Sequence, residues 1–177
     1  MRPIPPSRTH VIAAMLLIGL LQVPAPAVAG TESLSGTRTV AVSGTGTDLL
    51  NGAIVYSKET TSTGSIERST VDVELNGDLH GRVLYHVTTK VDTAKGTLVN
   101  TGDQVFSGTV AGSKPVMIHD SKFRFEVNLN TGAESGSVFL VDHIAGPRVR
   151  CELSVTGAGK TAEGNPTFKY AGNCKFK

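Results

Sequence analysis

A two-residue alternation of apolar and polar side chains runs along most of this chain and restricts what it can fold into. VDVEL at 71–75 and KFRFEVNL at 122–129 alternate strictly, and RVRCELSV at 148–155 does the same. Successive side chains of a strand point to opposite faces, so each segment can bury one face and expose the other. No window of ten residues in 30–177 shows the apolar spacing of three and four that is typical of an amphipathic helix. The pattern predicts an all-β domain.

Turn-forming residues separate the alternating segments. Asn76-Gly77-Asp78 follows the first of them, Asn130-Thr131-Gly132 follows the second, and Gly146-Pro147 precedes the third. Further strands are expected at 38–44, 53–61, 79–91, 97–110, 137–144 and in the last segment of the chain. About eight strands joined by short turns indicate a β-sandwich or a β-barrel, with a mostly antiparallel meander as the simplest topology. Val73, Phe125 and Leu153 lie on the apolar side of their segments, so we expect them in the core.

The N-terminal segment has the features of a secretory signal peptide. Arg2 and Arg8 precede an apolar run at 11–21, and Ala27-Val28-Ala29 is a site of the kind that signal peptidase cleaves. The run is shorter than the roughly 20 residues that span a bilayer, which argues against a membrane anchor. We expect residues 1–29 to be removed and residues 30–177 to form one domain in the periplasm or outside the cell.

Removal of the signal peptide leaves a chain with no net charge. Arg2 and Arg8 account for the whole formal charge of +2. The remaining charges are of both signs and interspersed, without a basic run or basic residues interleaved with aromatic ones. This argues against nucleic acid as a partner.

Export changes how the only two cysteines, Cys151 and Cys174, are interpreted. Two thiols in an oxidising compartment usually form a structural disulfide, and the absence of a C-x-x-C motif argues against redox or zinc chemistry. Both cysteines fall on the apolar side of their segments, as partners across a core would. We therefore predict a disulfide between them, with the glycine-rich segment 156–166 as a mobile loop.

The second half of the chain resembles a known family. The order of FSGTV, the turn AGSK, FRFEVNLNTG, GSVFL and the tail TGAGKTAEGNPTFKYAGNCKF is similar to that in the allene oxide cyclase barrel superfamily, which includes the plant dirigent proteins, and within it to a small bacterial branch. The resemblance covers roughly 70–176. It implies an antiparallel eight-stranded barrel with an apolar mouth, and it carries over no catalytic residue.

Tyr56 and Tyr85 are the candidates for ligand-binding groups inside a barrel, since a buried phenol needs a partner for its hydroxyl. The other reading of both is that they fill the core. His80 and His86 have the strand parity of solvent-facing residues, so we expect no metal site. The segment GTGTD at 44–48 is expected to be a plain loop, because no helix follows that would make it a phosphate site.

These observations predict a secreted or periplasmic barrel that binds a small apolar or aromatic molecule or has a structural role, with no cofactor. One alternative is an isomerase or cyclase like the named enzymes of the superfamily. Another is a surface or host interaction module. A barrel of this size is filled by side chains or holds one small ligand, so the sequence leaves open whether a cavity exists. It also leaves the catalytic residues and the oligomeric state open.

Overall fold

The computed structural model describes residues 36–177, so the predicted signal peptide and its cleavage site lie outside the described residues. This part of the chain is all β. The strands are β1 (Arg38–Thr61), β2 (Gly64–Gly77), β3 (Leu79–Asp92), β4 (Thr97–Val110), β5 (Val116–Asn128), β6 (Glu134–Leu140), β7 (Asp142–Ala145), β8 (Val149–Lys160) and β9 (Pro166–Phe176). Within the described residues there is no helix that is long and apolar enough to cross a bilayer.

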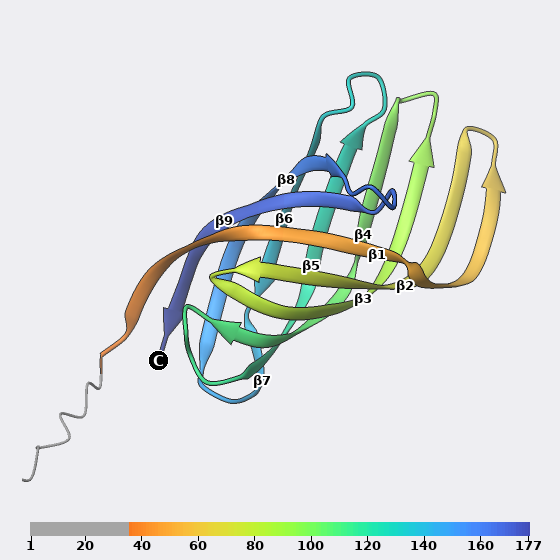
Figure 1. Ribbon diagram of the computed structural model, residues 1–177. Helices are drawn as coiled ribbons and strands as arrows, with labels where there is room; N and C mark the ends of the chain where they lie inside the picture. The colour runs from red at the N-terminus through yellow and green to blue at the C-terminus, as the bar shows by residue number, and fades with distance from the viewer. Residues whose placement is uncertain (1–35) are drawn as a thin grey trace, which may run out of the picture. The chain divides into compact units, whose positions relative to one another are not determined.

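Eight of the strands close into an antiparallel barrel (Figure 1). Each strand is hydrogen-bonded to the next in the order β1, β2, β3, β4, β5, β6, β8 and β9, and β9 pairs back with β1. The remaining strand, β7, pairs with β5 and lies outside this ring. The prediction of an all-β fold with an antiparallel eight-stranded barrel is confirmed.

Strand β1 is longer than the sequence pattern predicts. The segment 44–48, expected to be a loop, lies in the middle of β1 and pairs with β2 on one side and, as far as Thr47, with β9 on the other. Gly44 and Gly46 face the interior, where a Cβ atom would lie 2.3 Å from the Tyr170 hydroxyl oxygen and 2.1 Å from a ring carbon of Phe168, respectively. Glycine is therefore required here to make room for aromatic rings, and it does not mark a turn.

The predicted strand 137–144 is divided in two. It is interrupted at Val141, between β6 and β7, although both parts lie alongside β5 in the same register. Within β6, past its pairing with β5, the N–H of Phe139 donates to the Asp120 carboxylate at 2.8 Å instead of to a backbone carbonyl. At the interruption, the N–H of Val141 donates to the His119 carbonyl at 3.1 Å. The prediction of one continuous strand was wrong, because the regular pairing with β5 stops at Ser137 and resumes only at Asp142.

The fully buried part of the core lies at the end of the barrel where β3, β5 and β8 begin. Val73 and Leu153 are buried as predicted, and Phe125 is partly buried against the core. The apolar alternation of β8 is reproduced in its burial, because its inward residues are buried and its outward residues are exposed. The largest fully buried side chains are Phe106, Leu79, Ile118, Leu140, Val110, Val116, Val149, Asp120, Cys151 and Cys174.

Cys151 and Cys174 lie opposite each other on β8 and β9, at disulfide-bonding distance and with Cα atoms 4.1 Å apart. The segment 156–166, predicted to be a loop, is mostly strand, because β8 continues to Lys160 and β9 begins at Pro166. The disulfide therefore links two paired strands of one hairpin across a sequence separation of 23 residues.

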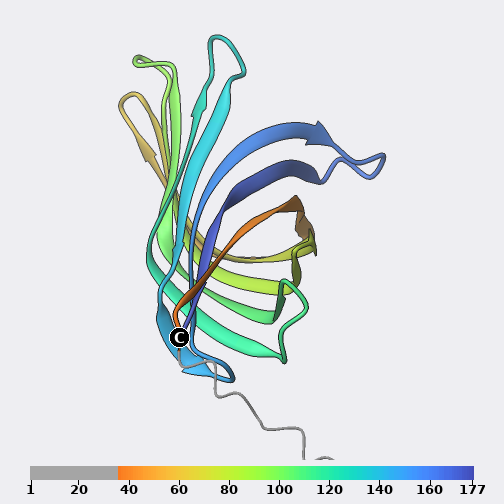
Figure 2. The same ribbon diagram turned by 90° about the vertical axis from the view of Figure 1, so that its left-hand side faces the viewer.

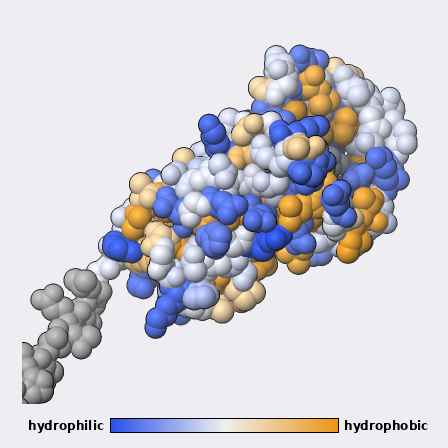
Figure 3. Space-filling view, in the orientation of Figure 1, coloured by the Kyte–Doolittle hydropathy of each residue, from blue (hydrophilic) through white to orange (hydrophobic). Residues whose placement is uncertain are grey.

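The barrel is uneven at its open end. Pairing between β1 and β9 stops at Thr47 and Thr167, whereas pairing between β2 and β3 continues to Gly64 and Asp92. The hairpins consequently rise above the rim and splay apart (Figure 2). Figure 3 shows hydrophobic residues at the surface of the molecule. The exposed large hydrophobic residues of β1 are Leu50, Ile54, Val55 and Tyr56.

Candidate functional site: a cavity at the open end of the barrel

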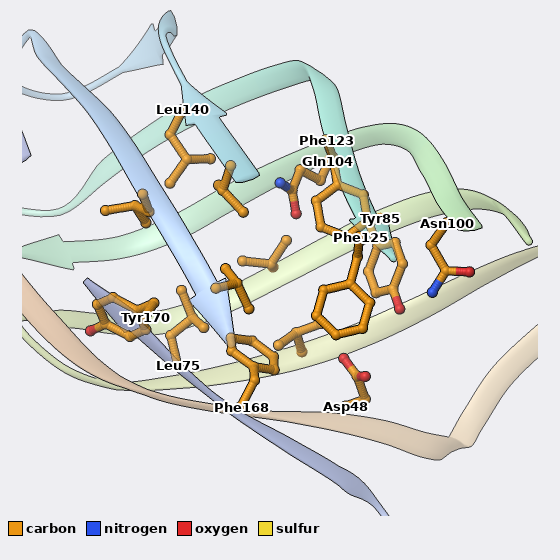
Figure 4. Close-up of a pocket in the computed structure, with 15 residues that line it drawn as sticks. Asp48, Leu75, Tyr85, Asn100, Gln104, Phe123, Phe125, Leu140, Phe168 and Tyr170 are labelled. Carbon is orange, nitrogen blue, oxygen red and sulfur yellow. The ribbon is translucent and has the colours of Figure 1, made fainter. Parts of the chain in front are cut away.

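A cavity of about 60 Å³ lies inside the barrel between the packed core and the open end. Most of its wall is apolar, and its polar groups come from strands far apart in the sequence (Figure 4). The lining residues are Asp48, Val73, Leu75, Val83, Tyr85, Asn100, Gln104, Phe123, Phe125, Val138, Leu140, Leu153, Val155, Phe168 and Tyr170.

Aromatic rings form the outer part of the wall. Tyr85 and Phe123 contact each other with ring centroids 5.6 Å apart and planes tilted by 57°. Phe125 and Phe168 are only partly buried against the core. Because dense packing on all sides is what fixes a side chain, these two rings have more freedom than the fully buried residues below them.

Asp48 brings a carboxyl group into this apolar wall. Its position on β1 follows the inward parity of Gly44 and Gly46, directly opposite Val73 of β2. Burial raises the pKa of the Asp48 carboxyl from its ordinary value of 3.8 to about 6, and the negative charge of Glu134 adds to the increase. Both protonation states of Asp48 are therefore accessible near neutral pH.

Glu134 reaches the same end of the barrel from β6. Its side chain lies over Gly157 of β8, where a Cβ atom would be 2.0 Å from Glu134 Oε2. Two carboxyl groups thus approach the mouth from strands on different sides of the barrel. Coulomb repulsion from Glu134 favours the protonated form of Asp48.

Tyr85 supplies a hydroxyl group that stays protonated. Burial raises the pKa of its phenol above the ordinary value of 10.0, and the nearby Asp48 carboxylate raises it further. A phenol in this state can donate a hydrogen bond, either to a ligand or to a protein group.

Two amides complete the polar lining. Gln104 donates from Nε2 to Asp120 Oδ2 at 2.8 Å, and Figure 4 shows its amide oxygen on the cavity side. Asp120 also accepts from the backbone N–H groups of Lys122 and Phe139 at 2.7 and 2.8 Å, so its role is structural. Asn100 differs, because its buried Oδ1 has no hydrogen-bond partner within the described part of the chain.

Tyr170 closes the inner end of the cavity and is fully engaged. Its hydroxyl accepts from the Leu79 N–H at 2.8 Å and lies 3.0 Å from the Leu79 carbonyl oxygen, to which it can donate. The contact joins β9 to the start of β3, 91 residues away in sequence. Tyr170 therefore stabilises the barrel and offers a ligand only its ring.

The two tyrosines predicted from the sequence lie in different places. Tyr85 is buried and lines the cavity. Tyr56 does not lie inside the barrel, which corrects the expected position: it is 57% exposed, hydrogen-bonds to Thr70 and stacks on the exposed His86. Bulges interrupt the pairing of β1 with β2 between Leu49 and Ser57, so Tyr56 does not continue the inward parity of Gly44, Gly46 and Asp48.

A histidine outside the barrel has carboxylate partners that the sequence pattern did not reveal. His119 of β5 lies 3.3 Å from Asp103 of β4 and 3.5 Å from Asp142 of β7. Adjacent residues of a strand point to opposite faces, so neither His119 nor Asp142 finds its partner next to it in sequence. The cluster forms only because β5 pairs with β4 on one side and with β7 on the other. Among residues 36–177 no group of three or more His, Cys, Asp or Glu side chains is arranged to hold a metal ion.

Sequence reasoning missed Asp48, Asn100, Gln104 and Glu134. Asp48 was assigned to a loop, although the spacing of Val40, Val42, Gly44, Gly46 and Asp48 continues the period of two. That regular spacing was the available signal for Asp48. The other three are single polar residues within β segments, and no local pattern distinguishes an inward amide from an outward one.

Fold and site together define an antiparallel β-barrel with a small, mostly apolar interior cavity. No family model, no curated protein and no solved structure matches the chain.

Proposed function

We propose that the barrel binds a small, largely apolar molecule through the open end, with one polar group of the ligand at Asp48. The observation that carries this proposal is the composition of the cavity wall: aliphatic and aromatic side chains line it together with one carboxyl group, one phenol and two amides. Ligand sites have this character, because apolar surface supplies affinity and a few polar groups supply orientation.

The size of the cavity limits the ligand. A volume of about 60 Å³ is well below the roughly 150 Å³ that accommodates benzene in an engineered protein cavity. A ring can enter only when the partly buried Phe125 and Phe168 move aside toward the mouth. The rest of the ligand then lies between the raised hairpins, so the cavity holds one end of the molecule.

Binding of the uncharged fluorescent probe N-phenyl-1-naphthylamine tests this proposal. Val138→Phe places extra volume in the cavity wall and should weaken probe binding at least tenfold. Leu84→Phe adds a ring on the outer face of β3, where Leu84 is 46% exposed, and should leave binding unchanged. Equal probe binding by both variants, with circular dichroism showing both folded, would place the apolar site elsewhere.

An isomerase or cyclase is the second candidate, and Asp48 is the observation that favours it. A carboxyl group with a pKa of about 6 can both accept and donate a proton near neutral pH, as general acid–base catalysis requires. An isomerisation would convert a bound ligand at constant mass. NMR of a ligand incubated with the protein should then show new resonances that do not form with Asp48→Asn.

We further propose that the protein works in the periplasm or outside the cell. The paired Cys151 and Cys174 support an oxidising compartment. The signal-peptide pattern of residues 1–29 supports export. Intact mass of the exported protein tests this, because a chain that retains its first 29 residues would contradict the expected cleavage after Ala29.

A further inference from the structure

The charged groups that reach the cavity are all acidic. Asp48 lies in the wall, and Glu134 is close enough for its charge to raise the pKa of Asp48. Within residues 36–177 neither carboxylate forms an ion pair with a basic side chain. The outward Glu74 of β2, in contrast, pairs with Arg82 at 3.2 Å.

An unpaired carboxylate in an apolar wall is unfavourable for the free protein. Removing a charge from water is expensive unless a counter-charge or several hydrogen bonds replace the lost solvation. A cation that enters the cavity would supply that counter-charge to Asp48. Asn100 lines the same wall with its amide nitrogen toward Asp48 and its unpaired Oδ1 turned away (Figure 4). A primary ammonium group has three N–H donors, from which the two Asp48 oxygens can accept.

The aromatic wall is also suited to positive charge. Figure 4 shows the Asp48 carboxylate pointing into the space bounded by Tyr85, Phe125 and Phe168. A cation near the face of an aromatic ring is attracted by the ring quadrupole, and the attraction is larger where water is excluded. The same rings accommodate an apolar substituent. Carboxylate and rings together favour a molecule that is cationic at one point and apolar elsewhere.

We propose that the ligand is a small organic cation, an amine or ammonium group on an aromatic or aliphatic body, with its charged nitrogen at Asp48. This inference rests on the proposed binding function and names the chemical class of its ligand. Neutral and anionic molecules of the same shape should bind more weakly, because they leave the carboxylate without a counter-charge or repel it.

The inference also predicts a pH dependence. Besides Asp48, the titratable groups at the cavity are Tyr85 on β3 and Glu134 on β6, whose charges interact with Asp48, and Tyr170 on β9 at the inner end. The lining residues of β2, β4, β5 and β8 carry no titratable group. The phenols stay neutral across the physiological range. Binding of a cation should therefore weaken as the pH falls through about 6, where Asp48 takes up a proton.

Three probes with one ring and different charge test the inference: benzylamine as its ammonium ion, benzyl alcohol and benzoate. We expect the affinities measured by NMR titration at pH 7.5 to follow that order, with the ammonium ion roughly tenfold to a hundredfold ahead of the alcohol, as a charge-assisted hydrogen bond allows. Asp48→Asn should remove this preference, and so should lowering the pH to 4.5. Glu74→Gln, which changes an outward carboxylate, should retain it.

The outcomes separate the inference from the proposed function. Binding of benzyl alcohol as tight as that of benzylamine would overturn the cationic ligand and leave apolar binding intact. A preference that survives in Asp48→Asn, or that is lost equally in Glu74→Gln, would overturn the assignment to Asp48. If none of the probes shifts resonances of the cavity residues, both the inference and the proposed function fail. Thermal unfolding of each variant establishes that the comparison is between folded proteins.

Discussion

Replacing Asp48 with asparagine should make the folded protein more stable at neutral pH. The substitution retains the shape of the side chain and removes a charge that the apolar wall disfavours. The pKa of Asp48 is raised in the folded protein, so the folded state holds a proton that the unfolded state releases. Stability is then lost as the pH rises from the unfolded value of 3.8 to the folded value of about 6.

The magnitude follows from the two pKa values. Each unit of difference corresponds to about 1.4 kcal/mol, so a rise from 3.8 to about 6 sets an upper limit of about 3 kcal/mol. Asp48 keeps some contact with water at the mouth, which screens part of the effect. We therefore expect Asp48→Asn to raise the free energy of unfolding by roughly 1 to 3 kcal/mol at pH 7.5. Below pH 4 the gain should vanish.

Urea denaturation at pH 7.5 and pH 3.5, followed by far-UV circular dichroism, measures this difference in a chain that contains no tryptophan. Glu74→Gln is the matched control, because its exposed ion pair with Arg82 should contribute less than about 1 kcal/mol. The reasoning would be refuted if Asp48→Asn were neutral or destabilising at pH 7.5. A gain of equal size at both pH values would refute it as well.

Three other substitutions or treatments test the structure. Reduction of the Cys151–Cys174 bond should lower the free energy of unfolding by about 3 kcal/mol in the chain-entropy model, and unfolded protein without reductant should show no titratable thiol. Gly46→Val should lower the free energy of unfolding, measured by urea denaturation, by about 1 to 3 kcal/mol, since its Cβ would lie 2.1 Å from a ring carbon of Phe168. Asp120→Ala should lower the free energy of unfolding by roughly 3 to 5 kcal/mol, because it leaves buried donors without an acceptor.

The two substitutions each have a control on the outer surface. Gly52→Ala should be tolerated, because its Cβ would meet nothing closer than a backbone oxygen at 3.7 Å. Glu152→Ala removes an exposed carboxylate of β8 and should change stability little. A tolerated Gly46→Val would mean that the Phe168 ring is not seated against β1. Equal effects of Asp120→Ala and Glu152→Ala would deny the buried role of Asp120, and two titratable thiols would exclude the disulfide.

The alternation of apolar and polar residues was sufficient to predict the strands and most of their faces. Val73 and Leu153 are buried because one side of each strand must leave water, and this requirement can be read within five residues of sequence. The hairpin turn at Asn76-Gly77-Asp78 and the shared face of the two cysteines follow from equally local rules. The number of strands in the barrel could be predicted from the chain length and the spacing of the turns, because each turn is also specified by residues close together in sequence.

Which face a residue points to can be predicted from its neighbours only as far as the next bulge, because a bulge inserts a residue and reverses the alternation. In β5 the inward residues are Ile118 and Asp120 before the bulge and Phe123 and Phe125 after it, so the spacing gains one residue. The bulges in β1 likewise turn Tyr56 to the outside. No local pattern predicts the bulge in β5, because the Asp120 carboxylate beside it accepts from donors on neighbouring strands.

The sequence by itself determined which segments become strands, where the chain turns and which face of most strands is buried, because these depend on neighbours a few residues apart. The tertiary structure alone decided which polar residues meet. Asp48, Tyr85, Asn100 and Glu134 lie on β1, β3, β4 and β6, and they approach one end of the interior only because closure of the barrel fixes the register of every strand against the next. Register is a property of paired strands, so the cavity and the carboxyl groups that reach it come together only when the barrel closes.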